Sequence, residues 1–180
     1  MEKLHITPEN IARWLEQLIG SGRSVYAPVR TGERVDFKKI ARPEEVASDY
    51  VQTTQLVKKV VFPRTEELFS YRKEGKQVSV RQPDLQAIPE TVVWKIRPCD
   101  AAGFAPLSGI FNWDYKDGSY NARAERLTLI SFCCATSDEY CFCTSVGGGP
   151  GSTAGSDIQL TLLPDGGALV EVLTPKGERL

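Results

Sequence analysis

Four of the five cysteines in the chain lie close together, and the stretch that contains them ends in glycines. The cysteines of this stretch are Cys133, Cys134, Cys141 and Cys143, and the fifth, Cys99, lies upstream. Cysteine thiolates are soft ligands that bind zinc and iron–sulfur clusters. The alternative, in which cysteines serve only as small buried apolar residues, suits an isolated cysteine better than this group. The sequence therefore makes residues 133–151 the candidate metal centre.

The number of thiols matches one four-ligand site. The ligand set that we predict is Cys99, Cys134, Cys141 and Cys143, which suits a [4Fe–4S] cluster or a tetrahedral zinc ion. Structural zinc sites usually take ligands from pairs two to four residues apart. Here a single Phe142 separates two of the cysteines, and the only histidine is His5. The spacing therefore favours one [4Fe–4S] cluster, with zinc as the alternative.

Three smaller expectations concern the surroundings of these thiols. Side chains alternate along a strand, so Cys133 should share a face with Leu129 and Ser131 and be the surplus thiol. A helix start at Cys99 would favour its thiolate through the helix dipole. The backbone N–H groups of the glycine run would offer hydrogen bonds to cluster sulfurs, which makes these glycines candidate cofactor-binding residues: Gly147, Gly148 and Gly149.

Other chemistries fit the sequence less well. The glycine run lacks the Lys-Ser/Thr pair of a P-loop and precedes no clear helix, which disfavours a nucleotide site. Cys–His catalysis lacks a nearby histidine, and a thiol redox enzyme would need a CxxC pair that is absent. We therefore expect no catalytic residue in this chain.

Composition narrows the classes of partner. The 180 residues include 22 basic and 23 acidic residues, so there is no overall positive field for nucleic acid. No apolar run is long enough to span a membrane, and the N-terminus is too polar for a secretory signal. We therefore expect a cytoplasmic protein. In that reducing compartment, five cysteines are expected to stay unpaired.

The first half of the chain predicts a helix followed by strands. Thr7 and Pro8 are typical of a helix start, and the apolar spacing continues to Leu18. Residues 24–29 and 34–40 predict a hairpin, with a short helix or turn at 43–45. Residues 56–62 are rich in β-formers and predict a strand, 65–67 the first turn of a helix, and 77–80 a further strand.

The second half predicts the unit that gathers the cysteines. Residues 91–96 and 127–133 are apolar strands with helical sequence between them, which indicates a βαβ unit around 91–133. Residues 157–163 and 168–173 flank Pro-Asp-Gly-Gly and predict a C-terminal hairpin. The predicted fold is one α/β domain with a mixed sheet over residues 1–180. Its strand ends would bring Cys99 and Cys134 to one edge.

Several motifs together resemble one iron–sulfur family. They are Arg-Pro-Cys-Asp at 97–100, Cys-x₆-Cys-Phe-Cys-Thr-Ser at 134–145, Gly-Gly-Gly-Pro at 147–150 and Phe-Pro-Arg-Thr-Glu at 62–66. The family contains the beta subunit of cytoplasmic sulfhydrogenases and the A subunit of anaerobic sulfite reductase. The resemblance extends over roughly residues 20–175 and includes the loop cysteines.

The resemblance implies an electron-transfer subunit that works with flavin-containing and catalytic redox subunits of a hydrogenase or sulfite reductase. Members of the family usually continue into a ferredoxin-like domain with two cluster motifs. This sequence has no such motif up to Leu180, and we expect it to correspond either to an excised N-terminal domain of the family or to a stand-alone version of that domain.

Overall fold

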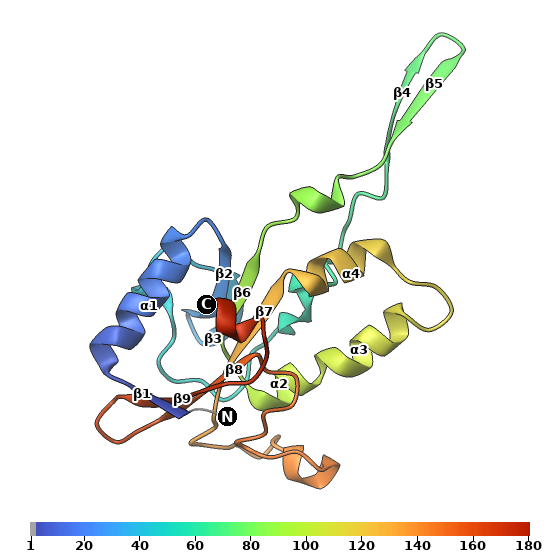
Figure 1. Ribbon diagram of the computed structural model, residues 1–180. Coiled ribbons are helices and arrows are strands. Elements are labelled where there is room, and N and C mark those ends of the chain that lie inside the picture. Colours follow the sequence, from blue (N-terminus) through green and yellow to red (C-terminus); the bar gives the residue numbers. More distant parts are fainter. Residues whose placement is uncertain (1–2) are drawn as a thin grey trace.

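In the computed structural model, which describes residues 3–180, the backbone forms one large mixed sheet (Figure 1). The sheet has seven strands in the order β1-β9-β8-β7-β6-β2-β3 within that range. Their bounds are β1 Lys3–Ile6, β2 Ser24–Thr31, β3 Arg34–Lys39, β6 Thr91–Ile96, β7 Leu127–Phe132, β8 Ile158–Leu162 and β9 Ala168–Val172. The strands β2, β6, β7 and β8 run parallel, and the outer strands β3 and β9 are antiparallel to them. The predicted α/β class is confirmed, as are both predicted hairpins.

Helices cover both faces of the sheet. Helix α1 (Pro8–Gly20) begins where the sequence predicts, and the backbone N–H of Asn10 donates to the Thr7 hydroxyl at 3.4 Å. Three further helices connect β6 to β7: α2 (Pro98–Ala102), α3 (Phe104–Phe111) and α4 (Gly118–Glu125). Because β6 and β7 are parallel neighbours, this connection is the predicted βαβ unit.

Each face of the sheet has its own hydrophobic core. On one face, α1 packs against side chains that include Trp94, which meets the rings of Trp14 and Phe132 edge-on at 5.1 and 5.3 Å. On the other face, residues of α2 and α4 pack against β6 and β7. Trp94 itself is only 2% exposed. Trp113, by contrast, is 82% exposed.

Two predicted elements are wrong. Residues 57–60 form a 3₁₀ helix, Val57–Val60, where the sequence predicted a strand. The valines at 57 and 61 lie one helical turn apart and are both buried in the same core, so packing favours a turn over an extended strand. No helix begins at 65–67. Glu66 instead forms an ion pair with Arg123 on α4 at 2.6 Å.

A two-stranded ribbon extends away from the body of the molecule (Figure 1). It consists of β4 (Ser70–Glu74) and β5 (Gln77–Arg81), and every residue in both strands is exposed. Tyr71 pairs with Val80 and Lys73 with Val78, so these side chains share one face of the ribbon. Because a lone two-stranded ribbon is marginally stable in water, it contributes little to the stability of the core.

Replacing residues 70–81 by a short Gly/Ser linker is therefore expected to change the melting temperature by less than about 2 °C. Ser70 and Arg81 are directly paired, so a few residues suffice to connect the ends. Thermal unfolding followed by circular dichroism measures the effect. Trp94→Ala, which empties a buried site, should lower the melting temperature clearly in the same assay. A fall of several degrees in the ribbon variant would contradict its independence from the core.

Within residues 3–180, no helix combines the length and the apolar character needed to cross a bilayer.

Candidate metal centre

The cysteines meet at the edge where β6 and β7 end. Ile96 at the end of β6 pairs with Ser131 near the end of β7. Cys99 lies in α2, directly after β6, and Cys134 lies just beyond β7. The predicted proximity of these two segments is confirmed by the parallel pairing. The Cys134 N–H donates to the carbonyl of Pro150 at 2.9 Å, and this contact holds together the two ends of residues 134–150, the cysteine loop.

Local hydrogen bonds shape the cysteine loop between these ends. The Cys141 N–H donates to the Asp138 carbonyl at 3.2 Å, and the Cys141 thiol donates to the Asp138 carboxylate at 3.3 Å. Gln52 donates to the same carboxylate at 3.0 Å, which ties the loop to a distant segment. Cys143 begins a 3₁₀ helix, Cys143–Val146. Cys141 is exposed and Cys143 is half-buried, so both thiols are accessible.

Two of the predicted ligands, Cys99 and Cys134, lie near enough to other thiols for the pKa of each to be raised by them. Burial raises the pKa of the Cys99 thiol, and the charges of Asp100, Cys134 and Cys143 raise it further. Burial also raises the pKa of the Cys134 thiol, where the Arg97 guanidinium acts in the opposite direction and the Cys143 and Cys141 thiolates add to the increase. A backbone hydrogen bond from Asp100 at the start of α2 lowers the pKa of the Cys99 thiol, as expected, but burial and the charges of Asp100 and Cys134 outweigh it, so the net change is an increase.

Cys133 faces a different neighbour. Its sulfur lies 3.1 Å from the Thr161 hydroxyl oxygen on β8, and its N–H donates to the Leu160 carbonyl at 2.9 Å. The side chain is thus engaged with β8, while its neighbour Cys134 is influenced by the other thiols. The assignment of Cys133 as the surplus thiol stays a prediction.

The thiols approach one another without forming a finished ligand set. All five cysteines are free thiols. Across residues 3–180, no three His, Cys, Asp or Glu side chains are gathered tightly enough to hold a metal ion. Four thiols still match a cluster or a zinc ion in ligand type and number. The donor chemistry of these residues therefore fits such a group.

The predicted glycines differ in their surroundings. Gly147 has a φ of 78° and ends the 3₁₀ helix in the left-handed conformation. The Gly148 N–H already donates to the Cys143 carbonyl at 2.9 Å, and the Gly149 carbonyl accepts from the Ser152 N–H.

Another glycine, Gly155, lies close against α2, the helix that carries Cys99. Its φ is +78°, and a Cβ there would lie 2.3 Å from the Ala101 carbonyl oxygen of α2.

Sequence analysis missed a group of side chains beside the cysteines. Lys95 has a φ of 62° and lies where the pairing of β6 with β7 is irregular. Its ammonium donates to the carbonyls of Ala47 and Ser48 at 3.1 and 2.6 Å, and its own carbonyl accepts from the Tyr50 hydroxyl at 2.5 Å. The guanidinium carbon of Arg97 lies 4.4 Å from the Tyr50 ring centroid. The one signal in the sequence was Arg97, through its place beside Pro98-Cys99.

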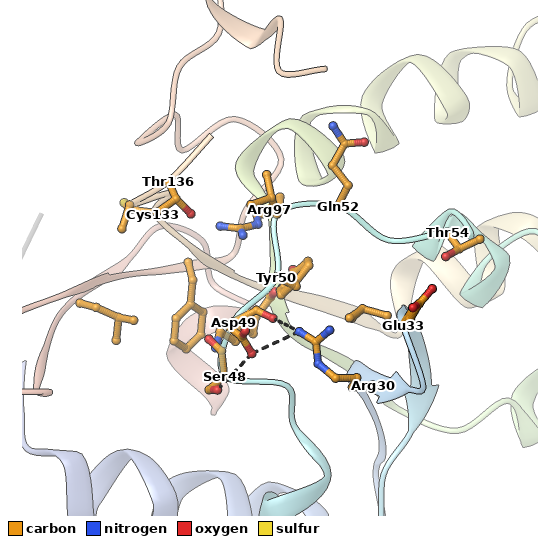
Figure 2. Close-up of a pocket in the computed structure, with 16 residues that line it drawn as sticks. Arg30, Glu33, Ser48, Asp49, Tyr50, Gln52, Thr54, Arg97, Cys133 and Thr136 are labelled. Carbon is orange, nitrogen blue, oxygen red and sulfur yellow. Dashed lines mark hydrogen bonds and ion pairs between the residues drawn. The ribbon is translucent and has the colours of Figure 1, made fainter. Parts of the chain in front are cut away.

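These side chains line a cavity of about 550 Å³, shown in Figure 2. The cavity lies between the 48–54 segment and the start of the cysteine loop, and its lining includes Cys133 and Thr136. Arg30 forms an ion pair with Asp49 at 3.2 Å on its wall. Arg97 and Lys95 add two more cations to the lining. The cavity thus brings positive charge to the base of the cysteine loop.

Comparison with known proteins finds a similar protein that is named as a subunit of a sulfhydrogenase. The chain is 30% identical over 175 residues to the sulfhydrogenase 2 subunit beta of Pyrococcus furiosus, and the match covers 97% of this chain. The chain spans about half the length of that relative, 49%. No family model matches the chain, and no solved structure matches it significantly. The chain is therefore a distant homologue of a sulfhydrogenase beta subunit.

Proposed function

We propose that residues 1–180 form a single iron–sulfur electron-transfer domain within a multi-subunit cytoplasmic oxidoreductase of the hydrogenase or sulfite reductase type. Its partners would be flavin-containing and catalytic redox subunits. The observation that carries the proposal is the placement of Cys99 and Cys134 at the ends of two neighbouring strands, near enough to other thiols of the set that these raise the pKa of both. The relative, itself a sulfhydrogenase subunit, supports the same class of role.

The roles of the residues follow from their positions. Cys99 and Cys134 would supply the two ligands fixed to the sheet edge, and Cys141 and Cys143 the two ligands carried by the loop. A bound [4Fe–4S] cluster supplies a one-electron carrier. Gly147, Gly148 and Gly149 would shape the loop around it. The exposed side chains of Tyr140, Phe142 and Val146 give the loop an apolar surface on which a redox partner would dock.

Anaerobic reconstitution with iron and sulfide tests the proposal. We expect about four irons per chain and a broad brown absorption, because four thiolates complete one cubane site. Metal and sulfide analysis, together with the visible spectrum, measure the result. Stoichiometric zinc without sulfide would instead favour a zinc-stabilised interaction domain, and a chain that binds neither metal would contradict both interpretations.

A further inference from the structure

We propose that Arg97 holds a fixed positive charge beside the Cys134 thiolate and thereby raises the reduction potential of the metal group bound by the four cysteines. The inference rests on the proposed function and assigns to Arg97 a role in setting the reduction potential. Arg97 would act through the ligand sulfur and is a positioning and charge-compensating residue.

The backbone brings Arg97 to the ligands. It directly follows β6, whose last residue pairs with Ser131 on β7, so it lies beside the end of β7, shortly before the cysteine loop begins. Arg97 lines the same cavity as Cys133 and Ala135, the two residues that flank Cys134 (Figure 2).

The guanidinium of Arg97 contacts one aromatic ring, and hydrogen bonds between other residues hold that ring in place. It stacks on the Tyr50 ring, with its carbon 4.4 Å from the centroid. The Tyr50 hydroxyl donates to the Lys95 carbonyl, and the Lys95 ammonium in turn donates to the carbonyls of Ala47 and Ser48. The unusual backbone of Lys95, with a φ of 62°, turns its carbonyl toward the Tyr50 hydroxyl. The cation is thus held in place before any group is bound.

One donor of Arg97 remains unused. Among the described residues, its Nε is one of two buried side-chain polar atoms that have no hydrogen-bond partner. A buried donor without a partner is costly, and this cost is removed when an acceptor arrives. A thiolate or a cluster sulfur at the Cys134 position would be such an acceptor.

Because reduction adds negative charge to the site, a nearby fixed cation stabilises the reduced form and raises the potential.

The test compares Arg97→Gln, Arg97→Lys and Arg30→Gln in the reconstituted full chain. Arg30→Gln is the matched control, since Arg30 lines the same cavity but pairs with Asp49. Iron content reports assembly, and a redox titration followed by electron paramagnetic resonance reports the potential. At a fixed solution potential, Arg97→Gln should lower the ratio of reduced to oxidised protein at least about threefold. Arg97→Lys should shift it less, and Arg30→Gln should leave it unchanged.

The outcomes separate the two proposals. A wild-type chain that takes up no iron contradicts the proposed function and this inference together. Full iron and an unchanged ratio in Arg97→Gln overturn the role of Arg97 alone. Iron lost in Arg97→Gln but kept in Arg97→Lys supports a role that depends on charge. Iron lost equally in both variants, in chains that still melt cooperatively, overturns that role and assigns Arg97 to packing.

Discussion

Cys134→Ser is expected to leave less than about one iron per chain after reconstitution, whereas Cys133→Ser, one residue away, is expected to keep the full complement. The two side chains differ in their neighbours. Cys134 is influenced by the charges of Cys141, Cys143 and Arg97, while the sulfur of Cys133 contacts Thr161 on β8. A serine hydroxyl at 133 can keep that contact, so we expect a stability cost of only about 1 kcal/mol.

Iron and sulfide measured on all five cysteine-to-serine variants decide the assignment. Cys99, Cys141 and Cys143 should behave like Cys134, because each supplies one ligand to the same proposed group. The adjacent pair provides its own control, since the two substitutions are chemically identical. Loss of iron in Cys133→Ser together with its retention in Cys134→Ser would show that the ligand assignment is wrong.

Gly155→Ala is expected to destabilise the fold by about 2–4 kcal/mol, which for a chain of this size lowers the melting temperature by roughly 5–10 °C. Gly155 has a φ of +78°, which an L side chain rarely adopts, and its Cβ would lie 2.3 Å from the Ala101 carbonyl oxygen. That oxygen belongs to α2, so relief of the clash would displace the helix that carries Cys99. Iron retention should therefore fall as well.

Gly109→Ala is the matched control for that substitution. Gly109 lies in α3, has ordinary backbone angles, and has open space where a Cβ would be placed. The same chemical change there should leave stability unchanged or slightly increased, since alanine favours a helix over glycine. Thermal melts and iron analysis of both variants measure the difference. Equal melting temperatures would contradict a close approach of the 155 backbone to α2.

The sheet was predictable because its strands carry strong local signals. Residues 91–96 and 127–132 are apolar runs separated by helical sequence, and parallel pairing of such strands follows from general rules of connection. The shared edge of Cys99 and Cys134 followed from that pairing. The spacing of the cysteines in sequence then indicated which chemistry to look for.

The surroundings of the thiols depended on contacts between distant segments, which a local pattern does not encode. Tyr50 reaches Lys95 only after the 48–54 segment folds back over the sheet, and neither residue lies in a motif. The turn at Val57–Val60 forms because two valines pack into a core built from other elements. The pKa of Cys99 also depends on the charges of Cys134 and Cys143, which are far from it in the sequence.

The exposed ribbon at 70–81 makes the chain sensitive to proteolysis at one place. It contains basic residues at 72, 73, 76 and 81, so a trypsin-like protease would find its first cleavage sites there. Cleavage would divide the molecule into an N-terminal fragment with Tyr50 and a C-terminal fragment with all five cysteines. The ladders of β2 with β6 and of β1 with β9 would still join the two. The fold is thus a natural candidate for fragment complementation, with the thiols on one fragment and the aromatic support of Arg97 on the other.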